Sequence, residues 1–141
     1  MEEQLKNKIT SLVEKAKNVY VSSVDSDGYP NTKAMFSLER DGLEVHYFSS
    51  NLSSERVSQF KANPKACIYY CDESRFNALM LIGTMEICTD RYHKERLWRK
   101  GFERYYPKGV DDEDYCVYKF TAQKAKFYPC ALGTFDIKEL L

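Results

Sequence analysis

The spacing of apolar residues changes along the chain from a helical period to a strand period. Between residues 2 and 17, apolar side chains recur three or four positions apart, with Lys and Glu between them. They are Leu5, Ile9, Leu12, Val13 and Ala16. This spacing predicts an amphipathic helix. Beyond it, short runs rich in β-branched and aromatic residues are separated by turn residues, which predicts strands.

The first three predicted strands are joined by short turns. They cover Val19–Val24, Pro30–Glu39 and Leu43–Phe48, with the turn sequences Asp25-Ser26-Asp27-Gly28 and Arg40-Asp41-Gly42 between them. Such turns are rich in residues that favour tight chain reversal. Because short connections join only antiparallel neighbours, we expect these strands to form a meander.

The rest of the chain predicts two further helices and four further strands. A short helix should follow the serine-rich segment Ser49–Ser54 and extend through Phe60, and another should run from Arg91 to about Lys100. The expected strands are Ala66–Cys71, Ala78–Thr89 and a last hairpin of Val117–Ala122 and Ala125–Phe135. Within the long second strand, Gly83 marks either a bulge or a close approach of another backbone.

About seven strands and three helices on a chain of 141 residues predict one mainly β (α+β) domain spanning residues 1–141. Short connections between so many strands favour a closed or nearly closed antiparallel barrel, because closure removes exposed strand edges. A sandwich with flanking helices is the alternative arrangement.

Charge and hydropathy exclude several classes of function. The 21 basic and 21 acidic residues balance and are spread evenly over both halves of the chain, which argues against nucleic-acid binding. The longest apolar run, Ala78–Ile82, is too short to span a bilayer. The N-terminal residues lack the basic start and apolar stretch of a signal peptide. We therefore expect a cytoplasmic protein without a membrane partner.

The five cysteines form no Cys-x-x-Cys pair. In a reducing compartment they are expected to be small buried apolar residues. Cys67 and Cys71 share one strand face, and with His46 or His93 they offer a possible metal site. Strands lack the tight knuckle that such sites use, so no metal is predicted.

The segment from Gly28 to Pro64 is the richest in candidate chemistry. It leads from a predicted strand through a hydroxyl-rich loop into a helix, whose N-terminus offers free N–H groups and partial positive charge. Ser50 and Ser54 add hydroxyls, Arg56 adds a cationic fork in the first turn, and Lys33 lies on a neighbouring strand. Together these groups suit a phosphate dianion. The alternative is that the serines only cap the helix and that Arg56 is solvated.

The order of these motifs resembles the pyridoxamine-phosphate-oxidase-like, FMN-binding split-barrel superfamily, and most closely its general-stress-protein branch. The matching features follow the N-terminal helix in order. They are Val-x-Ser-Ser-Val-Asp-x-Asp-Gly-x-Pro, Tyr-Phe-Ser-Ser…Ser-x-Arg-Val…Asn-Pro, Gly83-Thr84-Met85-Glu86, Asp90, Leu97-Trp98, Tyr105-Tyr106-Pro107 and Ala125-Lys126-Phe127-Tyr128. The similarity extends from about residue 5 to 136, and it implies an antiparallel split β-barrel.

The resemblance also implies a homodimer with FMN at the subunit interface. Carried over by position, Lys33, Ser49, Ser50, Ser54 and Arg56 would contact the FMN phosphate. Three residues would line the flavin ring: Ala34, Met35 and Phe36. Glu55 stands where the family often has Arg. Because adjacent helical residues point about 100° apart, we expect Glu55 to face solvent.

The resemblance implies a flavin-dependent oxidoreductase acting on an unknown small substrate. The flavin carries the hydride or electron chemistry, so no catalytic acid or base is required or assigned. True oxidases carry a C-terminal Arg- and His-rich segment, whereas Phe135–Leu141 has none, so oxidation of pyridoxamine phosphate is not expected. The alternatives are a non-enzymatic flavin-binding stress protein and an apo dimeric interaction module. Haem, with His46 or His93 as ligand, or a deazaflavin is a further option.

Overall fold

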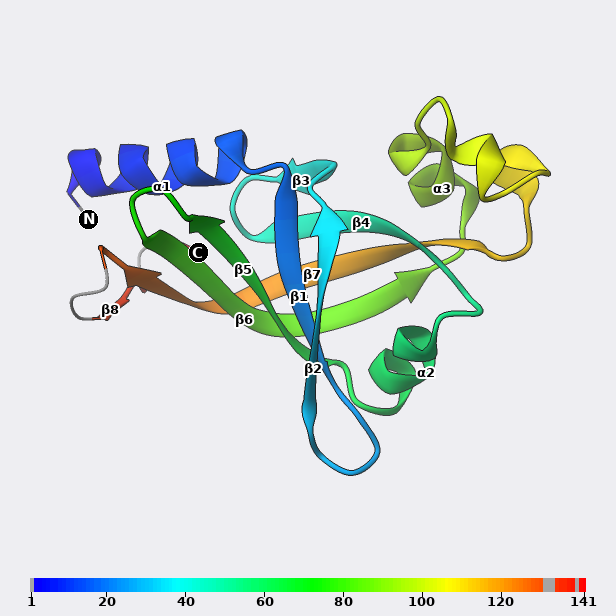
Figure 1. Cartoon of the computed structure of the whole chain (residues 1–141), viewed down its shortest axis with the longest axis horizontal. Coiled ribbons are helices and arrows are strands. Elements are labelled where there is room, and N and C mark those ends of the chain that lie inside the picture. The colour runs from blue at the N-terminus through cyan, green and yellow to red at the C-terminus, as the bar shows by residue number, and fades with distance from the viewer. Residues whose placement is uncertain (1, 131–133, 139) are drawn as a thin grey trace.

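A computed structural model describes residues 2–130, 134–138 and 140–141 of the chain (Figure 1). The helices are α1 (Glu3–Lys15), α2 (Glu55–Ala62) and α3 (Arg91–Leu97). The strands are β1 (Asn18–Val24), β2 (Pro30–Phe36), β3 (Glu39–Asp41), β4 (Val45–Asn51), β5 (Lys65–Asp72), β6 (Asn77–Cys88), β7 (Tyr115–Tyr128) and β8 (Phe135–Asp136). Two short 3₁₀ turns, η1 (Phe102–Arg104) and η2 (Gly109–Asp111), follow α3. None of the described helices is long and apolar enough to cross a membrane.

All strand pairs in the described residues are antiparallel, and their order is β2-β1-β5-β6-β7-β4-β3, with β8 added beside β7. The prediction of a mainly β split barrel with three helices is confirmed. The predicted meander is wrong, because β2 does not pair with β3. The second predicted strand, Pro30–Glu39, ends at Phe36. Residues Glu39–Asp41 form a separate strand that pairs with β4. Two hairpins therefore stand at opposite ends of the sheet, and the barrel is split between them.

The predicted last hairpin is also wrong, because Tyr115–Tyr128 is one continuous strand. The exposed pair Gln123–Lys124 suggests a turn in the sequence, but it lies at a β-bulge. Ile82 pairs with Lys124 and Gly83 with Ala122, so Gln123 is the extra residue. The part of the predicted second hairpin strand at 131–133 lies outside the described residues.

Gly83 is confirmed both at a bulge and at a close backbone approach. A Cβ atom on Gly83 would lie 1.9 Å from the carbonyl oxygen of Thr121 on β7. No side chain fits in that space, so glycine is required for β6 and β7 to meet at this register. These two strands are the longest in the sheet and cross the middle of the molecule (Figure 1).

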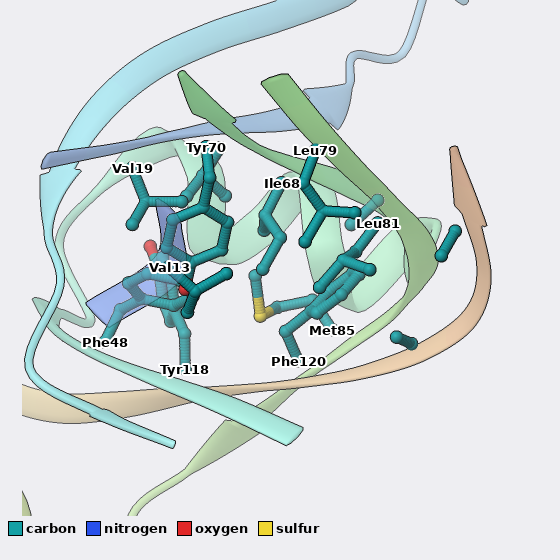
Figure 2. Packing of buried hydrophobic residues seen from close by; sticks show 14 of the residues in the cluster. Val13, Val19, Phe48, Ile68, Tyr70, Leu79, Leu81, Met85, Tyr118 and Phe120 are labelled. Carbon is teal, nitrogen blue, oxygen red and sulfur yellow. The ribbon is translucent and has the colours of Figure 1, made fainter. Parts of the chain in front are cut away.

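The main core fills the barrel and is closed by α1. Figure 2 shows Val13 of α1 in one cluster with Val19, Ile68 and Phe120 of the strands. Ile9 and Val13 are the buried residues of α1, which agrees with the helical spacing of the sequence. Burial of this apolar face holds the helix on the sheet, because a helix of 13 residues is marginal in water by itself.

A second, smaller core cluster holds α3 against β4 and β7. Its buried members are Tyr47, Cys88, Leu97, Tyr115 and Val117. The helix ends at Leu97 rather than near Lys100, since the backbone at Trp98 turns to an extended conformation. From there the chain enters the 3₁₀ turns, which lie beside α3 at one end of the molecule (Figure 1).

Candidate functional site

A groove of about 380 Å³ lies at the split of the barrel, where β2 and β4 do not pair. This volume is within the range of small-molecule sites. Six of the eight predicted cofactor-binding residues line it. They are Lys33, Ala34, Met35 and Phe36 of β2 and Ser49 and Ser50 of β4. The two strands belong to separate hairpins, so the fold brings together residues that are 13 or more positions apart in the sequence.

The groove presents one charge and several hydroxyl and amide groups. Lys33 is the only charged residue among the described residues that line it. Asn18 and Asn51 add amides beside Ser49 and Ser50. The Ser49 hydroxyl lies 3.1 Å from the Tyr115 hydroxyl, which fixes its position at the end of β4. A groove with a single positive charge favours an anionic ligand over a cationic one.

One wall of the groove is aromatic and comes from the segment after α3. Phe102, Tyr105 and Tyr106 line it together with Phe36 of β2. Trp98 packs behind this wall, with its ring centroid 5.6 Å from that of Phe102 and 6.2 Å from that of Tyr106. Packing against Trp98 therefore holds the rings of Phe102 and Tyr106 in place, and these rings offer apolar surface to a ligand.

Three residues of the aromatic wall, Phe102, Tyr105 and Tyr106, are not among the cofactor-binding residues predicted from the sequence. The segment Gly101–Asp114 reads as a turn-rich loop, although Tyr105 and Tyr106 are part of the family resemblance. The sequence feature that could have identified this wall is the cluster of Phe102, Tyr105 and Tyr106. It lies in a stretch that otherwise contains mainly glycine and charged residues. Aromatic residues in such a loop need a surface to cover, and here that surface is the groove.

The other two predicted residues, Ser54 and Arg56, do not line the groove. The Ser54 hydroxyl accepts a hydrogen bond from the backbone N–H of Arg56 at 3.3 Å and caps α2. Arg56 is only 8% exposed, so the alternative interpretation of a solvated side chain is wrong. Its Nη2 donates to the carbonyl oxygen of Val21, and its guanidinium lies over the ring of Phe60.

Arg56 and Tyr118 carry buried polar atoms without partners in the described residues. These atoms are Nε and Nη1 of Arg56 and the hydroxyl oxygen of Tyr118. Burial lowers the pKa of Arg56 and raises that of Tyr118, and the hydroxyls of Ser50 and Ser54 partly offset the second shift. Since native proteins satisfy nearly all buried polar groups, the two donor nitrogens of Arg56 call for an acceptor that the described residues do not supply.

Glu55 lies away from the groove. It is exposed and lines a separate hollow of about 460 Å³ together with Asp25 and Ser58. The expectation that Glu55 faces solvent is therefore confirmed, and its carboxylate does not oppose an anion in the groove. A larger hollow of about 560 Å³, between α1 and the β5–β6 turn, mixes lysines with Asp72 and Glu73 and contains none of the predicted residues.

Neither histidine lines the groove. His46 is fully buried, with Nε2 at 2.9 Å from the carbonyl oxygen of Leu43 and Nδ1 at 2.6 Å from the hydroxyl of Tyr70. Because the carbonyl can only accept, Nε2 carries the proton and Nδ1 accepts from Tyr70. Burial lowers the pKa of His46 to about 4. Both ring nitrogens of His46 are thus occupied, which leaves no free ligand atom for a haem iron.

Comparisons with known proteins place these features in context. Residues 5–128 match the family model described as pyridoxamine 5'-phosphate oxidase. A solved structure from Clostridium acetobutylicum, described as related to general stress protein 26 of Bacillus subtilis and to the pyridoxinephosphate oxidase family, is 43% identical. The match covers 100% of both chains with a TM-score of 0.87. A search of the curated proteins gave no match.

More distant structures share the fold. General stress protein 26 from Bacillus anthracis is 19% identical, with 95% of this chain and 99% of that chain covered and a TM-score of 0.76. A heme binding protein from Mycobacterium smegmatis is 11% identical and has a TM-score of 0.75. The match covers 97% of this chain and 59% of that chain. At these identities the likeness concerns the fold alone.

Proposed function

This chain belongs to the pyridoxamine 5'-phosphate oxidase family, and from that membership we propose that its groove binds FMN and that the protein is a flavin-dependent oxidoreductase. The observation that carries the proposal is the groove at the barrel split. It joins one cation, two serine hydroxyls and an aromatic wall around about 380 Å³. A phosphorylated planar cofactor needs this combination of an anion-binding end and a flat apolar end.

The groove offers two kinds of contact, and they suit the two parts of FMN. Lys33 and Ser50 would bind the phosphate, and the buried Tyr118 lies near the hydroxyls of Ser50 and Ser54. The two unpartnered guanidinium nitrogens of Arg56 fit an anion near this cluster. Each charge-assisted hydrogen bond to the phosphate would contribute about 1.5–3 kcal/mol.

The remaining groove residues would hold the ring. Ala34, Met35 and Phe36 lie along β2, and Tyr105 and Tyr106 lie on the aromatic wall. When bound, FMN supplies a ring that takes up hydride or electrons, which requires no acid or base from the chain. The protein then positions the ring, keeps bulk water from its covered face and leaves an open side for a small substrate.

We propose further that two copies of the chain form a homodimer across this groove. Phe36 is 70% exposed and Tyr105 is 69% exposed, and both border the groove. β2 is also an edge strand with no partner on its outer side among the described strands. Exposed aromatic rings beside an unprotected edge are typical of an interface. Sedimentation should give the mass of two chains, and a monomer that binds FMN at all concentrations would contradict this arrangement.

The FMN proposal is tested by absorption spectroscopy and by titration of the purified protein with FMN, followed by fluorescence quenching. We expect saturable binding that Lys33→Ala weakens about 10- to 100-fold, through loss of one charge-assisted contact. Lys65→Ala is the matched control, because this exposed lysine on β5 lines none of the three hollows. Unchanged affinity in the double variant Lys33→Ala/Ser50→Ala would overturn the site.

Oxidoreductase activity is tested separately from binding. Anaerobic NADH or NADPH should bleach the flavin absorption of the loaded protein, and an added electron acceptor should restore it. A protein that binds FMN but is not reduced by either donor would instead be a non-enzymatic flavin-binding protein. A colourless protein that does not bind added FMN would favour the alternative function of a dimeric interaction module.

A further inference from the structure

A cluster of side chains that can bind a metal ion lies at the turn from β6 into α3. Cys88 is the last residue of β6, Asp90 caps α3, and His93 lies in its first turn. One sulfur, oxygen or nitrogen atom from each of the three residues lies within 4.8 Å of the others. None of the three lines the groove. The chain thus gathers a thiol, a carboxylate and an imidazole within six consecutive residues.

The three ligand atoms, all within 4.8 Å of one another, can reach one metal ion after small shifts. Ligand atoms at about 2.1 Å from zinc stand roughly 3.4 Å apart. Nδ1 of His93 is 2.8 Å from each carboxylate oxygen of Asp90, so these two groups need to separate only slightly. Asp90 accepts the backbone N–H of His93 through Oδ2, and its other oxygen keeps lone pairs for a ligand bond.

We propose that Cys88, Asp90 and His93 bind one Zn²⁺ ion, with solvent as the fourth ligand. Sulfur, imidazole nitrogen and carboxylate oxygen together suit this borderline metal better than they suit Ca²⁺ or Mg²⁺, which bind oxygen. The Asp90 side chain is about half exposed, which gives the ion a path from solvent. In this site the metal would lie between the Asp90 carboxylate and Nδ1 of His93, which face each other in the structure.

The surroundings of Cys88 oppose an ionised thiol without a metal. Burial raises the pKa of this thiol to about 11, with smaller contributions from the carboxylates of Glu86 and Asp90. Lys119 on β7 acts in the opposite direction. Tyr47 and Tyr115 pack in the same cluster. Zinc binds the thiolate form of cysteine, so binding displaces the Cys88 proton.

The position of the site suggests what the ion does for the fold. α3 holds the proposed ligands at its N-terminus, and Trp98 at its C-terminus supports the aromatic wall of the groove. A metal bound to Cys88 on β6 and to His93 on α3 would tie the helix to the sheet. Because the ion binds the folded state, it should raise the melting temperature in proportion to the logarithm of its concentration.

The test uses the full-length protein, treated with a chelator and then titrated with ZnCl2 by calorimetry and with CoCl2 by absorption. We expect one Zn²⁺ per chain, and for Co²⁺ a thiolate-to-metal charge-transfer band with tetrahedral visible bands. His93→Gln and Asp90→Asn should each weaken zinc binding by about tenfold or more. Asn also caps helices well, so Asp90→Asn retains α3.

The double variant Cys67→Ser/Cys130→Ser is the matched control, because it removes two thiols, one exposed and one half-buried, and keeps the three ligands. It should bind zinc as the natural chain does. The proposal is overturned if this control loses the binding while His93→Gln and Asp90→Asn keep it, or if bound Co²⁺ shows no charge-transfer band. Circular dichroism on each variant establishes that it is folded, so that a loss of binding reports on the site.

Discussion

Replacing Gly83 by alanine tests whether the close approach of β6 and β7 determines the stability of the barrel. The added Cβ would lie 1.9 Å from the carbonyl oxygen of Thr121, 2.9 Å from its carbonyl carbon and 3.0 Å from the Cα of Ala122. All three are backbone atoms, so no side-chain rotation relieves the contact. Ordinary van der Waals contact begins near 3.4 Å, and the two strands must therefore move apart by about 1.5 Å at this point.

A displacement of this size breaks the ladder hydrogen bonds beside the bulge, because N–H···O bonds weaken steeply beyond about 3.2 Å. Loss of two such bonds costs about 1–3 kcal/mol, and the loosened packing beneath them adds about 1–3 kcal/mol. We therefore expect Gly83→Ala to lower the free energy of unfolding by about 3 kcal/mol or more. For a chain of this length that corresponds to roughly 10 °C in melting temperature.

Urea and thermal unfolding followed by circular dichroism measure this effect. Gly109→Ala is the control, because a Cβ there meets nothing within 4 Å and the substitution costs only the strain of a positive φ of 72°. That strain is about 1 kcal/mol. If Gly83→Ala were no more destabilising than Gly109→Ala, the steric reasoning would be refuted.

Three further predictions concern buried polar groups. Tyr70→Phe should lower the free energy of unfolding in urea by about 1–3 kcal/mol, because it leaves Nδ1 of His46 buried without a donor; an unchanged urea midpoint would contradict this. Between pH 6.5 and about 4 the unfolded chain takes up a proton at His46, whereas the buried ring of the folded chain does not. The free energy of unfolding should therefore decrease by up to about 3 kcal/mol as the pH is lowered through this range. Urea midpoints at pH 7 and pH 4.5 measure this loss, and His46→Phe should lack that part of it. Arg56→Met should leave the stability of the flavin-free protein unchanged or raise it, because two buried guanidinium nitrogens have no partner in the described residues. The same variant should weaken FMN binding at least about tenfold, and an FMN titration equal to that of the natural chain would remove Arg56 from the site.

The sequence predicts local features of this fold better than long-range ones. The helical spacing gives α1, and Gly83 is correctly assigned to a close backbone approach within β6. The separation of β2 from β3 depends on pairing between distant strands, which a local pattern does not contain. The polar pair Gln123–Lys124 fits a turn and a bulge equally well, and only the register with β6 distinguishes the two.

The predicted site residues on strands line the groove, whereas those at the start of α2 do not. Lys33 and Ser50, carried over by position from the resemblance, lie on β2 and β4 and line one groove. The sequence does not determine the direction of Arg56, because a residue in the first helical turn reaches either solvent or the core depending on the packing of that helix. Here α2 packs so that Arg56 points inward to the carbonyl of Val21.

The bulge at Gln123 makes this point in the barrel unusually tolerant of a change in chain length. Removal of one residue from a strand normally turns every following side chain to the opposite face. At this position Ala122 already pairs with Gly83, and Lys124 already pairs with the preceding residue, Ile82. Deletion of Gln123 would therefore join two segments whose inward and outward faces already match, so homologous chains one residue shorter at this position can keep the same core.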